Sequence, residues 1–351
     1  MIIIGCDFHT RYQEIAWLDT DTGEMQERRL EHAGDEVGKF YAALPRPVRV
    51  GIEATGYSPW FERMLQELGH EYWIGDAAAI RASVVRKQKT DRRDAAQVLE
   101  LLRTQRFPRI WVPTPAERDL RQLVLHRVKL VQLRTKVQNQ LQAMALGQGL
   151  CRRKKLWSVR GRAELQSLPL DRWARRRRQE LLQLLDQLDG SIRELQAEVE
   201  QQARQHPEAA RLMTHPGVGP VTSLAFVLTI GPASRFARGK KVASYLGLNP
   251  SEHSSGGHQQ MGRISKQGNS TMRWLLVEAG QTAARHDPEL RRMYGRLKFR
   301  KGSAIAKVAI ARKLAVRLYW MLRSSSDYAG LVRMSGSSGS AVVPEDPESG
   351  R

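Results

Sequence analysis

Four acidic residues near the start of the chain have the residue types and spacing that could do chemistry. Asp7 in IIIGCDFHT and Glu53 in VRVGIEATG each follow an apolar run typical of a β-strand. Asp91 and Asp94 in KTDRRDA open a run with helical spacing and, three residues apart, would share one helix face. Converging carboxylates repel one another, and a hard cation that prefers oxygen ligands relieves that repulsion. We therefore predict that these four residues hold one or two Mg²⁺ ions, an arrangement suited to phosphoryl transfer.

Simpler interpretations exist for some of these residues. Asp91, taken alone, is more readily explained as the N-cap of the helix that Asp94 enters. Asp7 could be an ordinary turn residue. Glu53 has fewer simple explanations, because burial of an unpaired carboxylate after an apolar strand costs free energy. His9 and His215 are not obvious metal ligands, because no second histidine stands at ligand spacing.

The charge of the chain indicates its partner. The 351 residues include 57 Lys+Arg against 36 Asp+Glu, a formal net charge of +21. Such an excess favours nucleic acid as the partner. A membrane surface is disfavoured, because we find no strongly amphipathic basic helix with an aromatic face. No apolar run is long enough for a secretory signal or a membrane span, and the two cysteines, Cys6 and Cys151, are too few for a disulfide framework. We expect a cytoplasmic protein.

The elements that must position the acids alternate in type over residues 1–110. Strand patterns cover residues 2–5, 14–18, 25–30, 48–52 and 71–75, and helical patterns cover 60–68 and 94–103. Strands in a hairpin followed by βα units predict a mixed α/β sheet. Asp7 and Glu53 would then end neighbouring strands at one sheet edge.

Long helices follow over residues 111–205, so the fold class is α/β plus all-α. Residues 181–199 have an a/d seam and residues 120–144 a weaker heptad pattern. Together they predict an antiparallel coiled coil or a dimerising arm, and an ordinary helical hairpin explains them equally well. Residues 206–332 form a further α-rich domain, and residues 333–351 are expected to be a disordered tail.

Basic clusters along these helices are candidate nucleic-acid contacts. Residues 150–180 carry eleven Lys/Arg against three acids, and aromatic residues beside such clusters can stack on bases, although core packing is the simpler role. The cationic candidates here are Arg152, Arg153, Lys154, Lys155, Arg175, Arg176, Arg177 and Arg178, and the aromatic ones Trp111, Trp157 and Trp173.

The C-terminal part adds three further candidates. Gly217 and Gly219 in HPGVGPVTSLAF form a turn like that of a helix-hairpin-helix motif, which points amides at phosphate; ordinary turn chemistry explains it equally well. The Gly-rich stretch SSGGHQQMGRISKQGN contains Ser255 between cations that could neutralise phosphate. The cationic candidates of this part are Arg263, Lys266, Lys298, Arg300 and Lys301.

The motifs GCDFH, GIEATGY, KTDRRDA and YLGLNPSEHSSGG…GRISKQGN, in this order over about residues 1–330, resemble the DEDD transposases of bacterial insertion sequences, which are bridge-RNA-guided recombinases. The resemblance implies a RuvC-like (RNase H-like) N-terminal domain, a coiled-coil linker and a C-terminal transposase domain. It implies that the four acids are the metal-binding tetrad and that Ser255 is the nucleophile, with Ser254 the neighbouring alternative. It also implies a guide RNA encoded by the element.

The predicted reaction is DNA strand cleavage and rejoining through a 5′-phosphoserine intermediate, on element ends or a circular junction and a target. Two alternatives stay open: a junction-resolvase-like nuclease that uses Mg²⁺ and water, and a nucleic-acid-binding protein without activity. The seam at 181–199 and the need to hold two duplexes predict at least a dimer.

Overall fold

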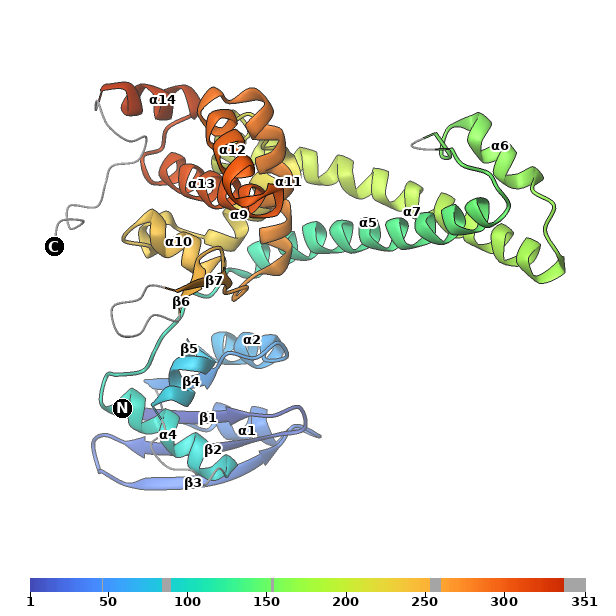
Figure 1. The fold of residues 1–351 in the computed structure, drawn as a ribbon. Helices are drawn as coiled ribbons and strands as arrows, with labels where there is room; N and C mark the ends of the chain where they lie inside the picture. The colour runs from blue at the N-terminus through green and yellow to red at the C-terminus, as the bar shows by residue number, and fades with distance from the viewer. Residues whose placement is uncertain (46, 84–89, 153–154, 253–259, 338–351) are drawn as a thin grey trace. The chain divides into compact units, whose positions relative to one another are not determined.

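The computed structural model describes residues 1–45, 47–83, 90–152, 155–252 and 260–337 (Figure 1). The chain divides into two compact units, Met1–Val112 and Pro113–Arg351. The finer division of the second unit at residues 205 and 206 stays a prediction.

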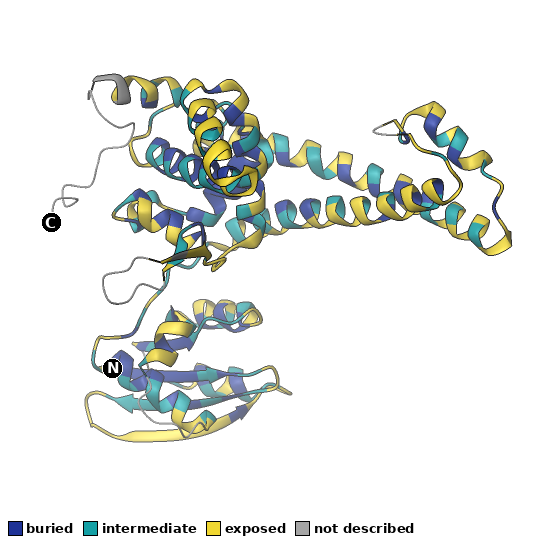
Figure 2. Ribbon diagram, viewed as in Figure 1, coloured by how far each residue is buried: buried dark blue, intermediate teal, exposed yellow. Residues whose placement is uncertain are grey.

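The first unit is built on a five-stranded mixed sheet in the order β3-β2-β1-β4-β5. Strand β1 pairs antiparallel with β2 and parallel with β4. Strand β3 is one of the two edge strands and, apart from Leu30, is exposed (Figure 2). This arrangement is consistent with the expected RNase H-like domain. The strands are β1 (Ile2–Phe8), β2 (Tyr12–Asp19), β3 (Met25–Glu31), β4 (Val48–Glu53) and β5 (Glu71–Gly75).

Helices cover both faces of this sheet. Alternate residues of β1, such as Ile4 and Cys6, pack with Tyr41 of α1 (Glu36–Ala42) and Phe61 of α2 (Pro59–Glu67). The intervening Ile3 packs with the helix on the opposite face. The helices on that opposite side are α3 (Ala77–Ala82) and α4 (Asp91–Arg103). The sequence pattern did not predict α1 and α3, which are too short to show a helical period.

The second unit starts with a long helical hairpin. Thr114 and Glu117 form a capping box at the start of α5 (Pro115–Gly147), which packs along α7 (Arg172–Gln205). The short helix α6 (Val159–Ser167) lies between them in sequence. One apolar cluster joins the two long helices and α6, with Val137, Leu141, Leu165, Leu185, Leu188 and Ile192 among its members. The predicted seam is therefore buried within the chain, and it does not by itself require a second copy.

Helix α9 (Pro220–Ile230) is buried along almost its whole length at the centre of the remaining helices' main apolar core. Its side chains share a core with Leu314 and with Leu120 and Leu123 of α5, so these two heptad residues belong to this core rather than to the hairpin. The other elements are α8 (Pro207–Leu212), a 3-10 turn (Ala233–Arg235), α10 (Gly239–Tyr245), β6 (Pro250–Glu252), β7 (Met261–Ile264), α11 (Ser270–His286), α12 (Pro288–Lys301), α13 (Ser303–Arg323) and α14 (Tyr328–Ser337). Helix α14 extends to Ser337, so the prediction of disorder from residue 333 was wrong at its start; residues 338–351 lie outside the described part.

A buried ionic group ties the C-terminal helices together. Asp287 caps α12 by accepting from the Leu290 amide at 2.7 Å. Its Oδ2 also accepts from Nη1 of Arg317 at 2.7 Å and from the Tyr328 hydroxyl at 2.6 Å. Nδ1 of the neighbouring, buried His215 lies 2.9 Å from the Pro216 carbonyl. Because a buried charge is costly when it is unpaired, this group stabilises the packing of α12, α13 and α14 only as long as it is complete.

Among the described residues, no helix combines the length and apolar character that a transmembrane segment requires.

Candidate metal centre

The close approach of α4 to β1 sets the geometry of the candidate site. A Cβ atom at Gly5 would lie 2.3 Å from the carbonyl oxygen of Ala95 and 2.3 Å from the amide nitrogen of Leu99. Only glycine allows the helix backbone to rest on the strand at this distance. Asp7 stands two residues further along β1 and therefore faces the same side of the sheet, toward the start of α4.

The start of α4 leaves Asp91 available for this site. The Thr90 side chain caps the helix by accepting from the Arg93 amide, so the interpretation of Asp91 as the N-cap was wrong. Asp91 is the first helical residue, and its Oδ2 accepts a hydrogen bond from the Tyr12 hydroxyl at 2.8 Å. Tyr12 lies on the neighbouring strand β2 and thereby fixes the orientation of this carboxylate.

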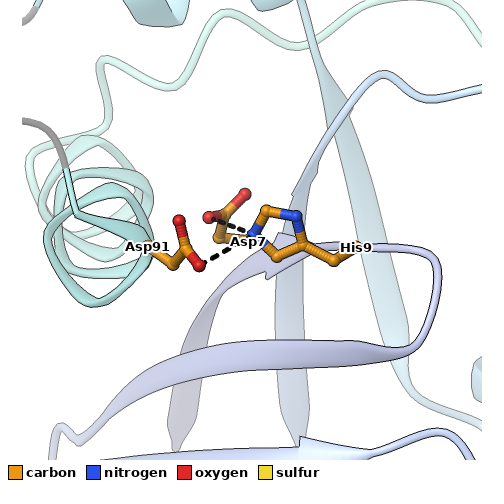
Figure 3. A group of neighbouring side chains, drawn as sticks. All are labelled: Asp7, His9 and Asp91. Carbon is orange, nitrogen blue, oxygen red and sulfur yellow. Dashed lines mark hydrogen bonds and ion pairs between the residues drawn. The ribbon is translucent and has the colours of Figure 1, made fainter.

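Asp7 and Asp91 meet at His9, whose ring points between them (Figure 3). Nε2 of His9 lies 3.0 Å from Oδ2 of Asp7 and 3.5 Å from Oδ2 of Asp91. One ligand atom from each of the three lies within 4.8 Å of the other two, a spacing that could hold a metal ion. The side chains are between 16% and 41% exposed, so an ion has access from solvent. His9, which was not an obvious ligand from the sequence, is thus a candidate ligand; the Asp-x-His spacing at the end of a strand was a signal that a search for a second histidine missed.

Glu53 and Asp94 lie around this group rather than within it. Cys6 of β1 pairs with Ile52 of β4 in parallel register. The next residues, Asp7 and Glu53, are therefore neighbours on the two strands, and both face the side of the sheet that α4 covers. Asp94 is in the first turn of α4, near enough for its charge to act on Asp7. Among the residues that the structure describes, however, the group of ligand atoms within 4.8 Å contains neither of them.

Burial raises the pKa of Asp7 above its ordinary value, and the negative charges of Asp94 and Asp91 add to that rise. The charge and hydrogen bond of His9 act in the opposite direction but do not cancel it. A cation among these groups would favour the ionised carboxylates. Two carboxylates with a third and fourth nearby and one imidazole form a donor set that fits a divalent ion such as Mg²⁺ or Mn²⁺.

The candidate serines belong to the second unit. Ser254 and Ser255 lie outside the described residues, between β6 and β7. Arg263 on β7 is exposed, and its carbonyl accepts from the Ser251 hydroxyl at 3.0 Å. Lys266 follows β7 with a φ of +57°, also exposed. Both cations are accessible to a phosphate.

The arginines of the basic tip have structural contacts that the sequence did not reveal. Arg178 donates to the carbonyls of Leu165 and Leu168 at 3.1 and 3.0 Å, and Arg175 donates to that of Leu170 at 3.0 Å. These bonds satisfy carbonyls at the end of α6 and after it, and so hold α6 against α7.

The other tip residues differ in how far they are engaged. Arg152 pairs with Glu164 at 2.6 Å, Arg176 with Glu180 at 2.8 Å, and Arg177 donates to Gln140 at 2.9 Å. Lys155 is exposed, and Arg153 and Lys154 lie outside the described residues. Trp157 packs against the hairpin cluster, Trp173 is exposed beneath the Arg172 guanidinium, and Trp111 is half-buried. Contact of this tip with nucleic acid stays a prediction.

The two glycines of the turn before α9 differ. Gly217 has a φ of +85°, and a Cβ there would lie 2.4 Å from the amide nitrogen of Ala283 in α11. The close packing of this turn against α11 therefore explains why position 217 requires glycine, without contact to a phosphate. Gly219 is the exposed N-cap residue of α9, with open space around its Cα.

Both units match known transposases. A transposase family model for DEDD proteins of IS110 elements matches residues 4–148, and the model described as the transposase IS116/IS110/IS902 family matches residues 209–295. The chain belongs to the IS110/IS116 family of DEDD-type transposases. A probable family 20 transposase of Pseudomonas aeruginosa is 29% identical over 92% of this chain and 96% of its own length. The transposase for insertion sequence element IS1111A of Coxiella burnetii is 27% identical over 93% and 91%, and that for IS1328 of Yersinia enterocolitica is 28% identical over 82% and 86%.

Membership of the IS110/IS116 family confirms the predicted class of protein, an insertion-sequence transposase that acts on DNA. The match over residues 4–148 spans the strands and the helix that bring Asp7 and Asp91 together.

Proposed function

We propose that this transposase cleaves and rejoins DNA strands with a divalent metal ion held by Asp7 and Asp91, with Glu53 and Asp94 as the remaining members of the acidic tetrad. The observation that supports the metal site most directly is the convergence of Asp7, His9 and Asp91 within 4.8 Å. His9 is the candidate third ligand. A bound Mg²⁺ would neutralise phosphate charge and lower the pKa of a hydroxyl that it contacts.

In the proposed reaction, Oγ of Ser255 attacks the scissile phosphorus. A phosphoserine ester forms with the 5′ oxygen of the downstream strand, and the bond from phosphorus to the 3′ oxygen of the upstream strand breaks. In net terms the proton of the serine hydroxyl passes to that 3′ oxygen, which leaves as a 3′-hydroxyl. Attack of a new 3′-hydroxyl on the phosphoserine reverses these steps, so rejoining needs no nucleotide hydrolysis. Arg263 and Lys266 would stabilise the charge of the phosphate in the transition state.

Residues around the carboxylates would hold them ready for this chemistry. The Tyr12 hydroxyl orients Asp91. Because the Thr90 side chain caps α4, the Asp91 carboxylate is not needed as the cap. Gly5 sets the distance between the strand that carries Asp7 and the helix that carries Asp91. Loss of such supporting contacts typically costs metal sites about 10–100-fold in affinity or activity.

Detection of a DNA–protein adduct on a denaturing gel tests the proposal. The purified protein, the element's ends, Mg²⁺ and the co-expressed flanking RNA should give an adduct that is lost in Ser255→Ala and in Asp91→Asn. Glu31→Gln, an exposed carboxylate of the same sheet, is the matched control and should keep the adduct. Full-rate cutting by both Ser255→Ala and Ser254→Ala would instead establish the alternative in which water attacks.

A guide RNA and an oligomer complete the proposal, and the guide RNA rests on the resemblance to bridge-RNA-guided recombinases. Preferential binding of the element's own non-coding transcript over an arbitrary RNA, at physiological salt, is the expected result for the first. At least a dimer in light scattering is expected for the second, because recombination must hold two duplexes.

A further inference from the structure

The C-terminal end of α12 presents an aromatic ring to solvent among cations. Phe299 is 94% exposed, an unusual state for a side chain that is normally buried. Lys298, Arg300 and Lys301 surround it in sequence and are also exposed. Gly302, with a φ of +84°, separates α12 from α13, and Ile305 in the first turn of α13 is 53% exposed. An apolar tip thus lies within a basic surface.

The helix leaves both the ring and its cations accessible. Residues three and four positions before Phe299 share its face, and these are Arg296, which is exposed, and Gly295. A Cβ atom at Gly295 would meet no atom within 4 Å, so the surface next to the ring is open. Among the described residues, no ion pair or side-chain hydrogen bond involves Lys298, Arg300 or Lys301.

Negative charge is also missing from this end of the helix. Glu289 is the single acidic residue of α12, and it is occupied by Lys313 at 3.4 Å and by Arg317 in the buried ionic group. The surface around Phe299 is therefore strongly cationic, and it fits a polyanion that also offers flat apolar surfaces. Nucleic acid combines phosphates with base faces, and aromatic stacking combined with backbone contacts is a common mode of binding it.

We propose that Phe299 stacks on a nucleobase or inserts at a base step while Lys298, Arg300 and Lys301 bind the flanking phosphates. The proposal rests on the proposed function in one respect, that the protein binds DNA or RNA, and it assigns the aromatic contact. A second copy of the chain is a poorer occupant, because two such basic tips would repel each other. An anionic bilayer would require a larger apolar face than one ring and one isoleucine.

Fluorescence anisotropy of the full-length protein with single-stranded and duplex oligonucleotides of about 16 nucleotides, at several salt concentrations, tests the proposal. Phe299→Ala should weaken binding about tenfold, the range expected for the loss of one stacked base, and should leave the salt dependence unchanged. Lys298→Ala should lower the slope of log affinity against log salt by about 0.7–0.9. Phe299→Trp should retain affinity, and a 2-aminopurine in the probe should be quenched by wild type and not by Phe299→Ala.

The controls separate failure of this inference from failure of the proposed function. If wild type binds no nucleic acid, the proposed function fails; if wild type and Phe299→Ala bind equally, only the role of Phe299 is overturned. The role of Phe299 would also be overturned if Phe299→Ala kept its nucleic-acid affinity but lost binding to phosphatidylserine vesicles, or lost an oligomer that wild type forms in light scattering. Equal melting temperatures for wild type and Phe299→Ala are expected, because the ring contributes almost no buried surface.

Discussion

Nε2 of His9 lies 3.0 Å from Oδ2 of Asp7, at the end of a strand whose preceding residues are buried. In this pair, burial disfavours the ionised form of the Asp7 carboxylate, and the neighbouring imidazole can bind a metal cation or a proton. Asp91 approaches the same nitrogen from a helix that starts more than eighty residues later in the chain.

Replacement of Asp7 by Asn should raise the melting temperature of the metal-free protein and abolish its stabilisation by metal. Burial raises the pKa of Asp7 in the folded protein, so the folded state holds the Asp7 proton more tightly than the unfolded chain does. The resulting contribution to the free energy of unfolding is fully present below the ordinary pKa of 3.8 and is lost as pH rises through the raised pKa. In EDTA at neutral pH, Asp7→Asn should therefore melt at a higher temperature than wild type. Added Mn²⁺ or Mg²⁺ should stabilise wild type and leave Asp7→Asn unchanged. A lower melting temperature of Asp7→Asn in EDTA would contradict this account, and Glu31→Gln serves as the control.

Replacement of His9 should alter which metal the site prefers. An imidazole ligand suits Mn²⁺ better than Mg²⁺, which prefers oxygen donors. His9→Ala should lower the affinity for Mn²⁺ by about 10–100-fold, as measured by calorimetric titration, and should affect Mg²⁺ less. His126→Ala, which removes an exposed histidine of α5, is the matched control. An equal loss for both ions would show that His9 orients Asp7 without binding the metal.

Gly5→Ala should disturb the site without changing any ligand. The added methyl would meet the backbone of α4 at 2.3 Å, so the helix must move away from β1 and carry Asp91 with it. We expect a loss of about 1–3 kcal/mol in unfolding free energy and at least about tenfold in metal affinity. Gly56→Ala, where nothing lies within 4 Å of the new methyl, should behave as wild type. Unchanged metal binding by Gly5→Ala would show that the helix position is not critical.

His215 should make the stability of the C-terminal helices depend on pH. Burial lowers its pKa from 6.5 to about 4, and the nearby Arg317 acts in the same direction. The unfolded chain therefore binds a proton at a higher pH than the folded protein, and stability falls as pH decreases from 6.5 to about 4. The full effect is about 3 kcal/mol, since one pKa unit corresponds to about 1.4 kcal/mol.

Urea denaturation of wild type and His215→Asn over this pH range measures that dependence. The pH slope should decrease in the variant, whatever its absolute stability. His286→Asn, at an exposed position in α11, should keep the wild-type slope. The same slope in His215→Asn as in wild type would contradict the assignment.

The sequence indicated Asp7 and Asp91 as candidate ligands, but it did not show the contacts that bring them together. The apolar run of β1 was recognisable only to Gly5, because Asp7 interrupts it, yet the strand continues to Phe8 through pairing with β2. The closeness of Gly5 to α4 is a tertiary contact that no local pattern contains. The position of His9 between Asp7 and Asp91 likewise depends on a helix far away in sequence, so periodicity could not predict it.

A cluster of cations in the sequence does not show which of its side chains have structural contacts within the protein. The run Arg175–Arg178 is typical of a nucleic-acid contact, but Arg175 and Arg178 satisfy backbone carbonyls near α6. Most of the seam at 181–199 packs on α5 of the same chain, a partner that the pattern could not distinguish from a second copy. Both cases show that a pattern predicts which face is used and leaves open what covers it.

Crystals of the protein soaked in Mn²⁺ and measured for anomalous scattering test the metal site most directly. We predict an anomalous peak within about 2.0–2.6 Å of carboxylate oxygens of Asp7 and Asp91, lost in crystals of Asp7→Asn. Anomalous density elsewhere in a protein that still cleaves DNA, with none between these two side chains, would contradict the account.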